Sequence, residues 1–320
     1  MRFVAAFALS ISILSPVLGA EVYPSKPITM ITAFPAGGPT DTNARILGNG
    51  IANELGQPIV IEAKPGGGSI IASAYVAQAK ADGYTILYNT SSLLLGKLTY
   101  SSATFDPLKD FVPVARTVGV PLVVAVNPSL PVKDLKELVE LAKNKPGALN
   151  YASSGTGTID HLAGALLFKQ LAIDLVHVPY KGTAPALVDV AGGRIEIMLT
   201  TLNTLLPYIN DKRLKPLAIA SLDRSPLLPD VPTVAESMNL PGFEITAWNG
   251  IVAPTGTPSA AVKRLNAAVN KTLQNQSVIK QFQDSGAEIY GGSSEDYGTY
   301  LKSELDRWQA VINDIGIQPQ

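Results

Sequence analysis

The sequence predicts an α/β protein of two lobes, and three features support this prediction. Apolar strand-like runs alternate with amphipathic helical patterns from residue 28 onward, which favours sheets of parallel strands covered by helices. The alternation begins again near residue 125, so the second half of the chain repeats the first. A long helical tail follows residue 250. The chain therefore crosses between the lobes twice, and we expect the tail to return to the first lobe.

The predicted division follows from these crossings. Residues 122–127 and 244–250 are the two crossover strands. The expected parts are residues 21–124 with 245–320 as lobe 1, and residues 125–244 as lobe 2. In open parallel sheets a ligand binds beyond the carboxyl ends of the strands, so we expect a site between the lobes.

The elements of the first lobe are short apolar runs and helices with apolar residues three and four apart, as in Ala44, Leu47 and Ile51. The predicted strands are residues 28–34, 58–62 and 84–88. The first helix runs from Thr40 to before Gly56, and the second follows three glycines at 66–68, which we interpret as a tight turn. Residues 89–106 show no regular pattern.

The second lobe and the tail continue the alternation. The predicted strands are residues 122–126, 149–152, 175–178, 195–199, 217–220 and 244–248. The predicted helices are residues 132–144, 159–171, 202–209, 258–273, 278–283 and 294–315, and a short helix that follows the turn of residues 179–185 and stops at Gly192.

The first glycine turn, residues 37–41, links the first strand to the first helix. Such a turn exposes backbone N–H groups at the positive end of the helix dipole, where an anion can bind without a charged side chain. Gly37, Gly38 and Thr40 are candidate ligand contacts on this basis. Asp41 is also a candidate, although a carboxylate repels an anion, so we expect it to cap the helix or to contact an amine or water of the ligand.

The second glycine turn, residues 153–158, repeats this arrangement before the helix of residues 159–171. It has four hydroxyls within six residues, whereas a plain turn needs only a glycine. The candidate contacts here are Ser153, Ser154, Gly155, Thr156 and Thr158. Two such turns predict two jaws that close on one small organic acid. Phe34, Ser91 and Tyr180 follow strands and are further candidates for the wall of this site.

Most enzyme signatures are missing from the sequence. It contains no phosphate loop, dinucleotide turn or nucleophile elbow. The two histidines, His161 and His177, and the absence of cysteine leave little material for a metal site, so we expect no cofactor and no metal. The alternative that stays open is an exported serine hydrolase that uses Ser153 or Ser154 with His161.

The N-terminus predicts export. An apolar run over residues 3–14 follows Arg2 and precedes Gly19 and Ala20, which is typical of a signal peptide, here residues 1–20. A membrane anchor is the alternative, but a span needs roughly 20 apolar residues. With no cysteine to carry a lipid, we expect a mature protein that is periplasmic and not lipid-anchored.

The charge balance excludes some partners. Without Arg2 the chain has 24 basic and 26 acidic side chains and no basic run. We therefore expect no binding to nucleic acid or to anionic membrane surfaces. Any anion is bound by local geometry.

Several motifs in order give the chain a family resemblance. They are residues 24–28 (PSKPI), 34–41 (FPAGGPTD), 153–158 (SSGTGT) with 161–164 (HLAG), 177–182 (HVPYKG) and 228–236 (LPDVPTVAE). Together they resemble the Bug, or TctC-like, substrate-binding proteins of tripartite tricarboxylate transporters, and they cover essentially the whole mature chain.

This resemblance implies a type II periplasmic binding protein fold of two Rossmann-like lobes. It implies a monomer that captures a small mono-, di- or tricarboxylate and delivers it to a membrane permease of one large and one small subunit. By motif, it assigns the ligand to the two glycine turns. Residues 89–96 depart from the usual polar pattern, because Leu93, Leu94 and Leu95 stand there. A preference for an apolar or aromatic acid is the hypothesis drawn from that departure.

Overall fold

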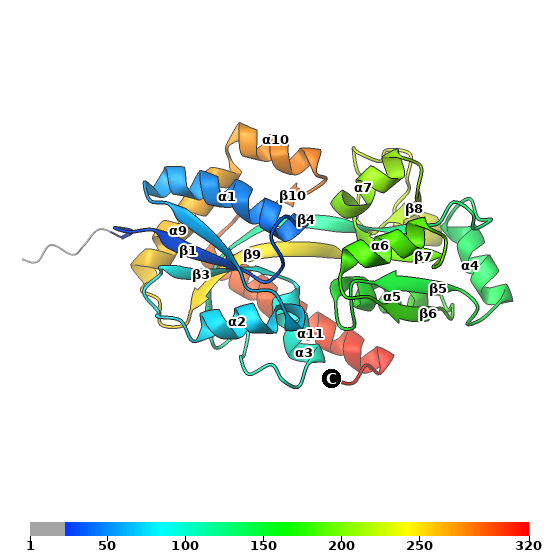
Figure 1. The fold of residues 1–320 in the computed structure, drawn as a ribbon, viewed down its shortest axis with the longest axis horizontal. Helices are drawn as coiled ribbons and strands as arrows, with labels where there is room; N and C mark the ends of the chain where they lie inside the picture. Colours follow the sequence, from blue (N-terminus) through cyan, green and yellow to red (C-terminus); the bar gives the residue numbers. More distant parts are fainter. Residues whose placement is uncertain (1–22, 320) are drawn as a thin grey trace, which may run out of the picture.

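Two sheets that share one long strand form the frame of the protein (Figure 1). A computed structural model describes residues 23–319, so the predicted signal peptide lies outside the described residues. The strands are β1 (Ile28–Thr32), β2 (Ile59–Ala63), β3 (Thr85–Thr90), β4 (Phe111–Val126), β5 (Asn150–Ser153), β6 (Val176–Pro179), β7 (Ile197–Thr201), β8 (Lys215–Ile219), β9 (Thr246–Pro254) and β10 (Glu288–Ile289).

Helices cover both sheets. They are α1 (Pro39–Leu55), α2 (Ile70–Ala77), α3 (Ser92–Thr99), α4 (Leu135–Asn144), α5 (Ile159–Gln170), α6 (Thr183–Ala191), α7 (Leu202–Asn210), α8 (Val234–Met238), α9 (Ser259–Leu273), α10 (Gln276–Asp284) and α11 (Ser294–Ile315). A short 3₁₀ helix, η1 (Gly67–Ser69), precedes α2. Among the described residues, no helix has the length and apolar character that a membrane crossing requires.

Each lobe has a parallel centre, as the alternation of strands and helices predicts. In the first lobe β1 lies between β2 and β3 and is parallel to both. In the second, β5 lies between β6 and β7 and is again parallel to both. In both lobes the glycine turn follows the central strand of the three, and the helix that begins there, α1 or α5, packs on the sheet.

β4 and β9 connect the two lobes. Both run antiparallel to the strands beside them, and β4 pairs with β9 from Phe111 to Pro121. From Leu122 onward β4 pairs instead with β7 and β8. The predicted strand of residues 122–126 is therefore only the last part of a 16-residue strand. This change of partner supports the division near residues 124 and 245, which we keep as a proposal.

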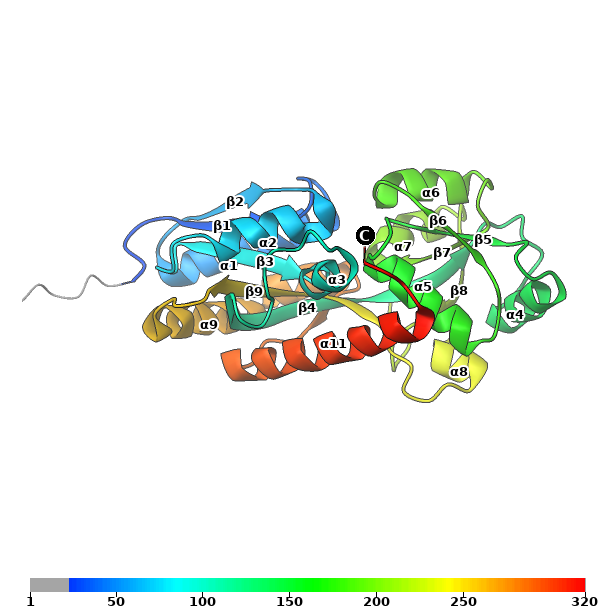
Figure 2. The same ribbon diagram turned by 90° about the horizontal axis from the view of Figure 1, so that it is seen from below.

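The C-terminal helix α11 touches both lobes, so the expectation that the tail returns to the first lobe describes only part of its contacts. The helix contacts β4 and α3, and also α5 of the second lobe. Its residues Trp308 and Ile312 belong to the core under α5 and β7. Figure 2 shows α11 running beneath both lobes.

Buried polar contacts fix α11 to the crossover strand β9. The carboxylate of Glu304, only 6% exposed, accepts hydrogen bonds from the indole N–H of Trp248 on β9, at 3.0 Å, and of Trp308, at 3.1 Å. These are the two tryptophans of the chain. The side chain of Arg307 pairs with the same carboxylate at 3.3 Å.

The stretch of residues 89–106, predicted to be irregular, contains helix α3. Leu93, Leu94 and Leu95 are fully buried in this helix and belong to two hydrophobic cores. They are core residues and do not line a ligand surface in this structure. The reason given for an apolar or aromatic acid is therefore removed.

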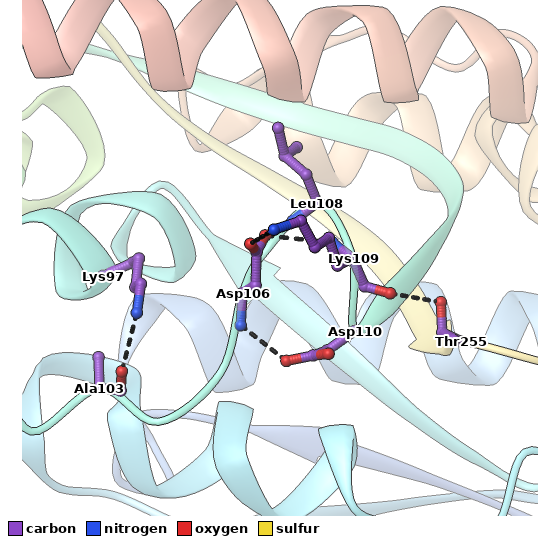
Figure 3. Close-up of polar contacts among 7 residues, drawn as sticks. All are labelled: Lys97, Ala103, Asp106, Leu108, Lys109, Asp110 and Thr255. Atoms are coloured by element: carbon purple, nitrogen blue, oxygen red, sulfur yellow. Dashed lines mark hydrogen bonds and ion pairs between the residues drawn. The ribbon is translucent and has the colours of Figure 1, made fainter.

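Local hydrogen bonds fix the connection from α3 to β4 (Figure 3). The ammonium of Lys97 on α3 donates to the carbonyl of Ala103 at 3.0 Å. Asp106 accepts from the amides of Leu108 and Lys109, while its own amide donates to the carboxylate of Asp110 at 2.7 Å. The hydroxyl of Thr255, just past β9, donates to the carbonyl of Lys109 at 2.7 Å. The connection is thus held at both ends.

Candidate functional site

The first glycine turn leaves the start of α1 uncapped by any side chain. Gly38 is the cap residue and Pro39 the first helical residue, so the first N–H groups free of helical partners are those of Thr40 and Asp41. Gly37 has φ +82°, a conformation that favours glycine. A Cβ built at Gly37 would meet no atom within 4 Å, so this turn faces open space.

Asp41 holds this turn from inside. Its Oδ2 accepts the amide of Gly37 at 3.0 Å and the guanidinium Nε of Arg45 at 2.8 Å, and its Oδ1 accepts Nη2 of Arg45 at 3.1 Å. The hydrogen bond from Arg45 keeps the pKa of Asp41 below its usual value. Asp41 thus binds the turn before the helix and does not cap the helix start, which was one of the roles expected for it, and its charge is balanced by Arg45. Arg45 was missed, although its spacing of four residues from an acid is a known helical pairing pattern.

The second glycine turn contains more internal hydrogen bonds. Ser153 is fully buried, and its hydroxyl lies 2.7 Å from Nε2 of His177 on β6 and accepts the amide of Gly155 at 3.2 Å. The hydroxyl of Thr158 donates to the carbonyl of Gly155 at 2.7 Å. These two hydroxyls shape the turn, and the partly exposed side chains of Ser154 and Thr156 remain at its surface.

An aspartate also holds the second turn. Asp160 Oδ2 accepts the amide of Ser154 at 3.4 Å, and Oδ1 accepts the hydroxyl of Thr200 at 3.2 Å. Burial raises the pKa of Asp160, and no Lys or Arg within residues 23–319 forms an ion pair with it. The start of α5, like that of α1, has no side-chain cap.

The end of α3 joins the first lobe to the second turn. The hydroxyl of Tyr100 donates to the carbonyl of Thr156 at 3.2 Å. A Cβ built at Gly157 would collide with the side chain of Thr99, so this close approach requires glycine. Tyr100 in turn packs on the tight turn before α2, where Gly68 lies against its ring. Sequence reasoning missed both Thr99 and Tyr100, because no local pattern marks them.

The remaining candidates from the sequence, Ser91, Phe34 and Tyr180, lie outside the two glycine turns. Ser91, only 2% exposed, precedes the first residue of α3, and its amide donates to the carbonyl of Trp248 at 3.2 Å. Its own carbonyl accepts the amides of two helix residues, so Ser91 fixes the start of α3. Phe34 is partly buried against the core of the first lobe. The hydroxyl of Tyr180 donates to Asp189 at 2.6 Å, and burial together with this carboxylate raises the pKa of Tyr180 to about 12.

The two turns are not joined directly. Within residues 23–319, no hydrogen bond connects residues 37–41 with residues 153–158. Figures 1 and 2 show the N-terminal end of α1 turned toward the lobe that carries α5 and α6. The second turn meets the first lobe through Thr99 and Tyr100.

The geometry does not support the hydrolase alternative. Ser153 pairs with His177 and not with His161, whose Nδ1 accepts the amide of Gly157 at 3.1 Å. Ser153 is fully buried, and no carboxylate in the described part of the chain hydrogen-bonds His177 as the third member of a triad would. In the same residues, no group of three His, Asp or Glu side chains could hold a metal ion.

Two α/β lobes connected by two crossover strands, with a glycine turn at the start of a helix in each, define a solute-binding protein. The chain belongs to the TctC family, since the model described as "Tripartite tricarboxylate transporter family receptor" matches residues 43–317. It is therefore a periplasmic solute-binding protein and not an enzyme. The predicted resemblance to Bug proteins is confirmed.

Relatives and solved structures agree with this assignment. The chain is 35% identical to Protein BugT of Bordetella pertussis, over 99% of this chain and 97% of BugT. The structure of R. palustris Rpa4515 with adipate is 34% identical, with a TM-score of 0.86, and the match covers 93% of this chain and all of Rpa4515. MatC from Rhodopseudomonas palustris, solved with bound malate, is 33% identical with a TM-score of 0.81, covering 91% of this chain and all of MatC.

Proposed function

We propose that the protein binds a small organic acid between its lobes, with a carboxylate held by the amides that begin α1 and α5. The observation that carries this proposal is the parallel construction of the two turns. In each, the helix start has no side-chain cap, and an aspartate of the first helical turn binds a turn amide from inside, as Asp41 does for Gly37 and Asp160 for Ser154. The helix amides beyond them stay free for an anion.

Other helices differ from α1 and α5 because a side chain caps their first turn. Asp134, Thr233, Asn275 and Ser293 cap the starts of α4, α8, α10 and α11 with their own side chains. Further helices start without a side-chain cap after a strand and a glycine, as α6 does after Gly182 and α9 after Gly256, but neither has an acidic residue in its first turn. α1 and α5 share four features: a preceding strand, a glycine turn, a helix start without a side-chain cap, and an aspartate of the first helical turn that accepts a turn amide.

The ligand we propose is a dicarboxylate. Adipate in Rpa4515 and malate in MatC are the ligands of two similar structures. The proposed contacts are those given by the sequence: Phe34, Gly37, Gly38, Thr40, Asp41, Ser91, Ser153, Ser154, Gly155, Thr156, Thr158 and Tyr180. Ser153, Ser91 and Thr158 would act through the shape of the site, because two are buried and the third bonds within its own turn.

The cellular setting is also a proposal. Residues 1–20 would be removed after export, and the absence of cysteine leaves the mature protein without a lipid anchor. The mature protein would work as a monomer and deliver its ligand to the large and small subunits of a tripartite tricarboxylate permease, in line with the receptor family to which it belongs.

A thermal-shift panel tests the proposal. Purified protein is heated with adipate, malate, citrate, benzoate or aspartate, and one aliphatic acid is expected to raise the melting temperature. A ligand at 100 times its Kd adds about 2.7 kcal/mol to the free energy of unfolding. Failure of every carboxylate, with turnover of an ester substrate, would contradict the proposal.

A charge substitution tests the position of the site. Ser154→Asp puts a second negative charge beside the proposed carboxylate, so we expect the shift caused by the ligand to disappear. Ser277→Asp, in the first turn of the capped helix α10, is the matched control and should keep the full shift. Retained binding by Ser154→Asp would move the site away from the second turn.

A further inference from the structure

Two stacked imidazoles lie directly behind the second glycine turn. The rings of His161 on α5 and His177 on β6 are 3.8 Å apart between centroids and nearly parallel, at 11°. His161 is 7% exposed, and His177 is partly buried. The two histidines come from different elements and meet at one turn, and the function proposed above does not use them.

Each imidazole holds a different part of the turn. His161 Nδ1 accepts the amide of Gly157 at 3.1 Å, and Nε2 of His177 lies 2.7 Å from the hydroxyl of Ser153. Ser153 in turn accepts the amide of Gly155. Because the Gly157 N–H donates, Nδ1 of His161 carries no proton. A second proton on His161 must bind at Nδ1, and it would break this hydrogen bond.

We propose that His161 and His177 are positioning residues, which as an uncharged stacked pair fix the second turn in its binding geometry, and that protonation of the pair releases the turn. The proposal rests on the proposed function only where it concerns ligand affinity. Protonation would also put positive charge on rings that now lie face to face, which adds repulsion between them.

The surroundings favour the uncharged pair. Burial lowers the pKa of His161 to about 4, and burial together with the neighbouring His161 lowers the pKa of His177 to about 4 as well. The pair is therefore uncharged at neutral pH and gains protons as the pH falls toward 4. The other titratable or charged groups near the turn are Asp160 on α5, Tyr151 on β5, Tyr100 after α3, and Tyr180, Lys181 and Asp189 from the β6–α6 region. Asp160 does not cancel the repulsion between the protonated rings. Burial raises its pKa, so this carboxyl takes up its proton at a higher pH than an ordinary aspartate and loses the negative charge that would stabilise them.

The first experiment needs no ligand. Hydrogen exchange is followed for peptides covering residues 153–160 in the wild type, His161→Ala and His161→Asn, with the α10 segment 275–284 as the internal reference. Asn can place its side-chain oxygen near the position of Nδ1, so it keeps the acceptor and cannot titrate. We expect exchange at Gly157 to be about tenfold faster in His161→Ala, as loss of a buried hydrogen bond implies, and mostly restored in His161→Asn.

The pH dependence separates positioning from simple packing. Relative to the α10 reference, exchange at Gly157 in the wild type should accelerate between pH 6 and pH 4, and that acceleration should be much reduced in His161→Asn. Tyr151→Phe keeps the ring whose centroid in Tyr151 lies 5.0 Å from that of His177. It is the matched control and should follow the wild type. Equal exchange in wild type and His161→Ala, or equal acceleration in wild type and His161→Asn, would overturn the proposal.

The second experiment measures affinity by calorimetry with adipate and with malate at pH 7.5 and pH 5. His161→Ala should weaken binding about tenfold at pH 7.5, with most of the loss recovered in His161→Asn. Because the ligand itself gains protons in acid, each variant is compared with wild type at the same pH. If neither acid binds the wild type, the proposed function loses its support for these ligands, while the exchange experiment still decides the role of the histidines.

Discussion

The two glycine turns perform the same structural task with opposite electrostatics. In the first, Asp41 is paired with the exposed guanidinium of Arg45, and Gly37 faces open space. In the second, Asp160 is buried to the same extent as Asp41, at 3% exposed, but has no cationic partner among residues 23–319. Both arrangements would reduce the repulsion between the aspartate and the proposed anion. The first does so by a countercharge, and the second because burial without a countercharge favours the protonated carboxyl.

This contrast indicates how each glycine turn should respond to salt and to substitution. The Asp41–Arg45 pair joins a buried carboxylate to a guanidinium whose side chain is 55% exposed, so salt screens it in part and its contribution to stability is small. A buried network tolerates salt but is sensitive to the loss of any one partner, since the groups left behind have no water to bind. The first turn should therefore be robust to substitution, and the second should be fragile.

The largest expected difference is between glycines of the two turns. Gly157 has φ +74° and approaches Thr99 closely, so Gly157→Ala should cost roughly 3 kcal/mol of unfolding free energy from backbone strain and overpacking. Gly37→Ala, with similar φ but no atom nearby, should cost about 1 kcal/mol. Urea denaturation measures both. Equal losses would mean that the contact with Thr99 carries no energetic weight.

The aspartates should differ in the same direction. Asp160→Ala leaves the amide of Ser154 and the hydroxyl of Thr200 without an acceptor in a buried place, at a cost of about 2 kcal/mol. Asp41→Ala should cost less, because the amide of Gly37 that it abandons is exposed to water. The same denaturation series tests this, with a larger loss in Asp41→Ala as the contradicting result.

Arg45→Ala should have the smallest effect on stability and a visible effect on binding. Without Arg45 the charge of Asp41 is uncompensated near the proposed carboxylate, so affinity should fall severalfold at low salt and less at high salt. Calorimetry at two ionic strengths measures it, and an unchanged Kd at low salt would argue that the first turn does not hold the ligand.

The pH dependence of this pair has a definite sign. Since Arg45 lowers the pKa of Asp41 below the usual 3.8, the stabilisation is present at neutral pH and is lost as the pH falls through the lowered value. In Arg45→Ala, the acid end of a melting-temperature profile should therefore be flatter than in the wild type.

Much of the fold could be predicted because local patterns agree with tertiary structure. The helix predicted at residues 294–315 is α11 with the same bounds. Helix α3 was missed, because its consecutive buried leucines have no amphipathic period to detect. Helix α8 was missed too, although Thr233 and Glu236 form a capping box that its sequence spacing could have indicated.

The candidate site could be predicted only in outline. Each turn is marked locally by a strand, by glycines and by the start of a helix, so the turns of residues 37–41 and 153–158 could be identified from the sequence. The partners that shape them were not, because they come from distant elements. His177 reaches Ser153 through the pairing of β5 with β6, and Tyr100 reaches Thr156 from the end of α3. Sequence spacing contains no signal for either contact.

The carboxylate of Glu304 gives the protein a natural optical probe. Both tryptophans donate to it, Trp248 from the crossover strand β9 and Trp308 from the helix that spans the lobes. If ligand binding rotates one lobe against the other, we expect this shared acceptor to be disturbed and the intrinsic fluorescence to change. No extrinsic dye would be needed to time the motion, and an emission spectrum that stays constant at saturating ligand would indicate that closure bypasses this contact.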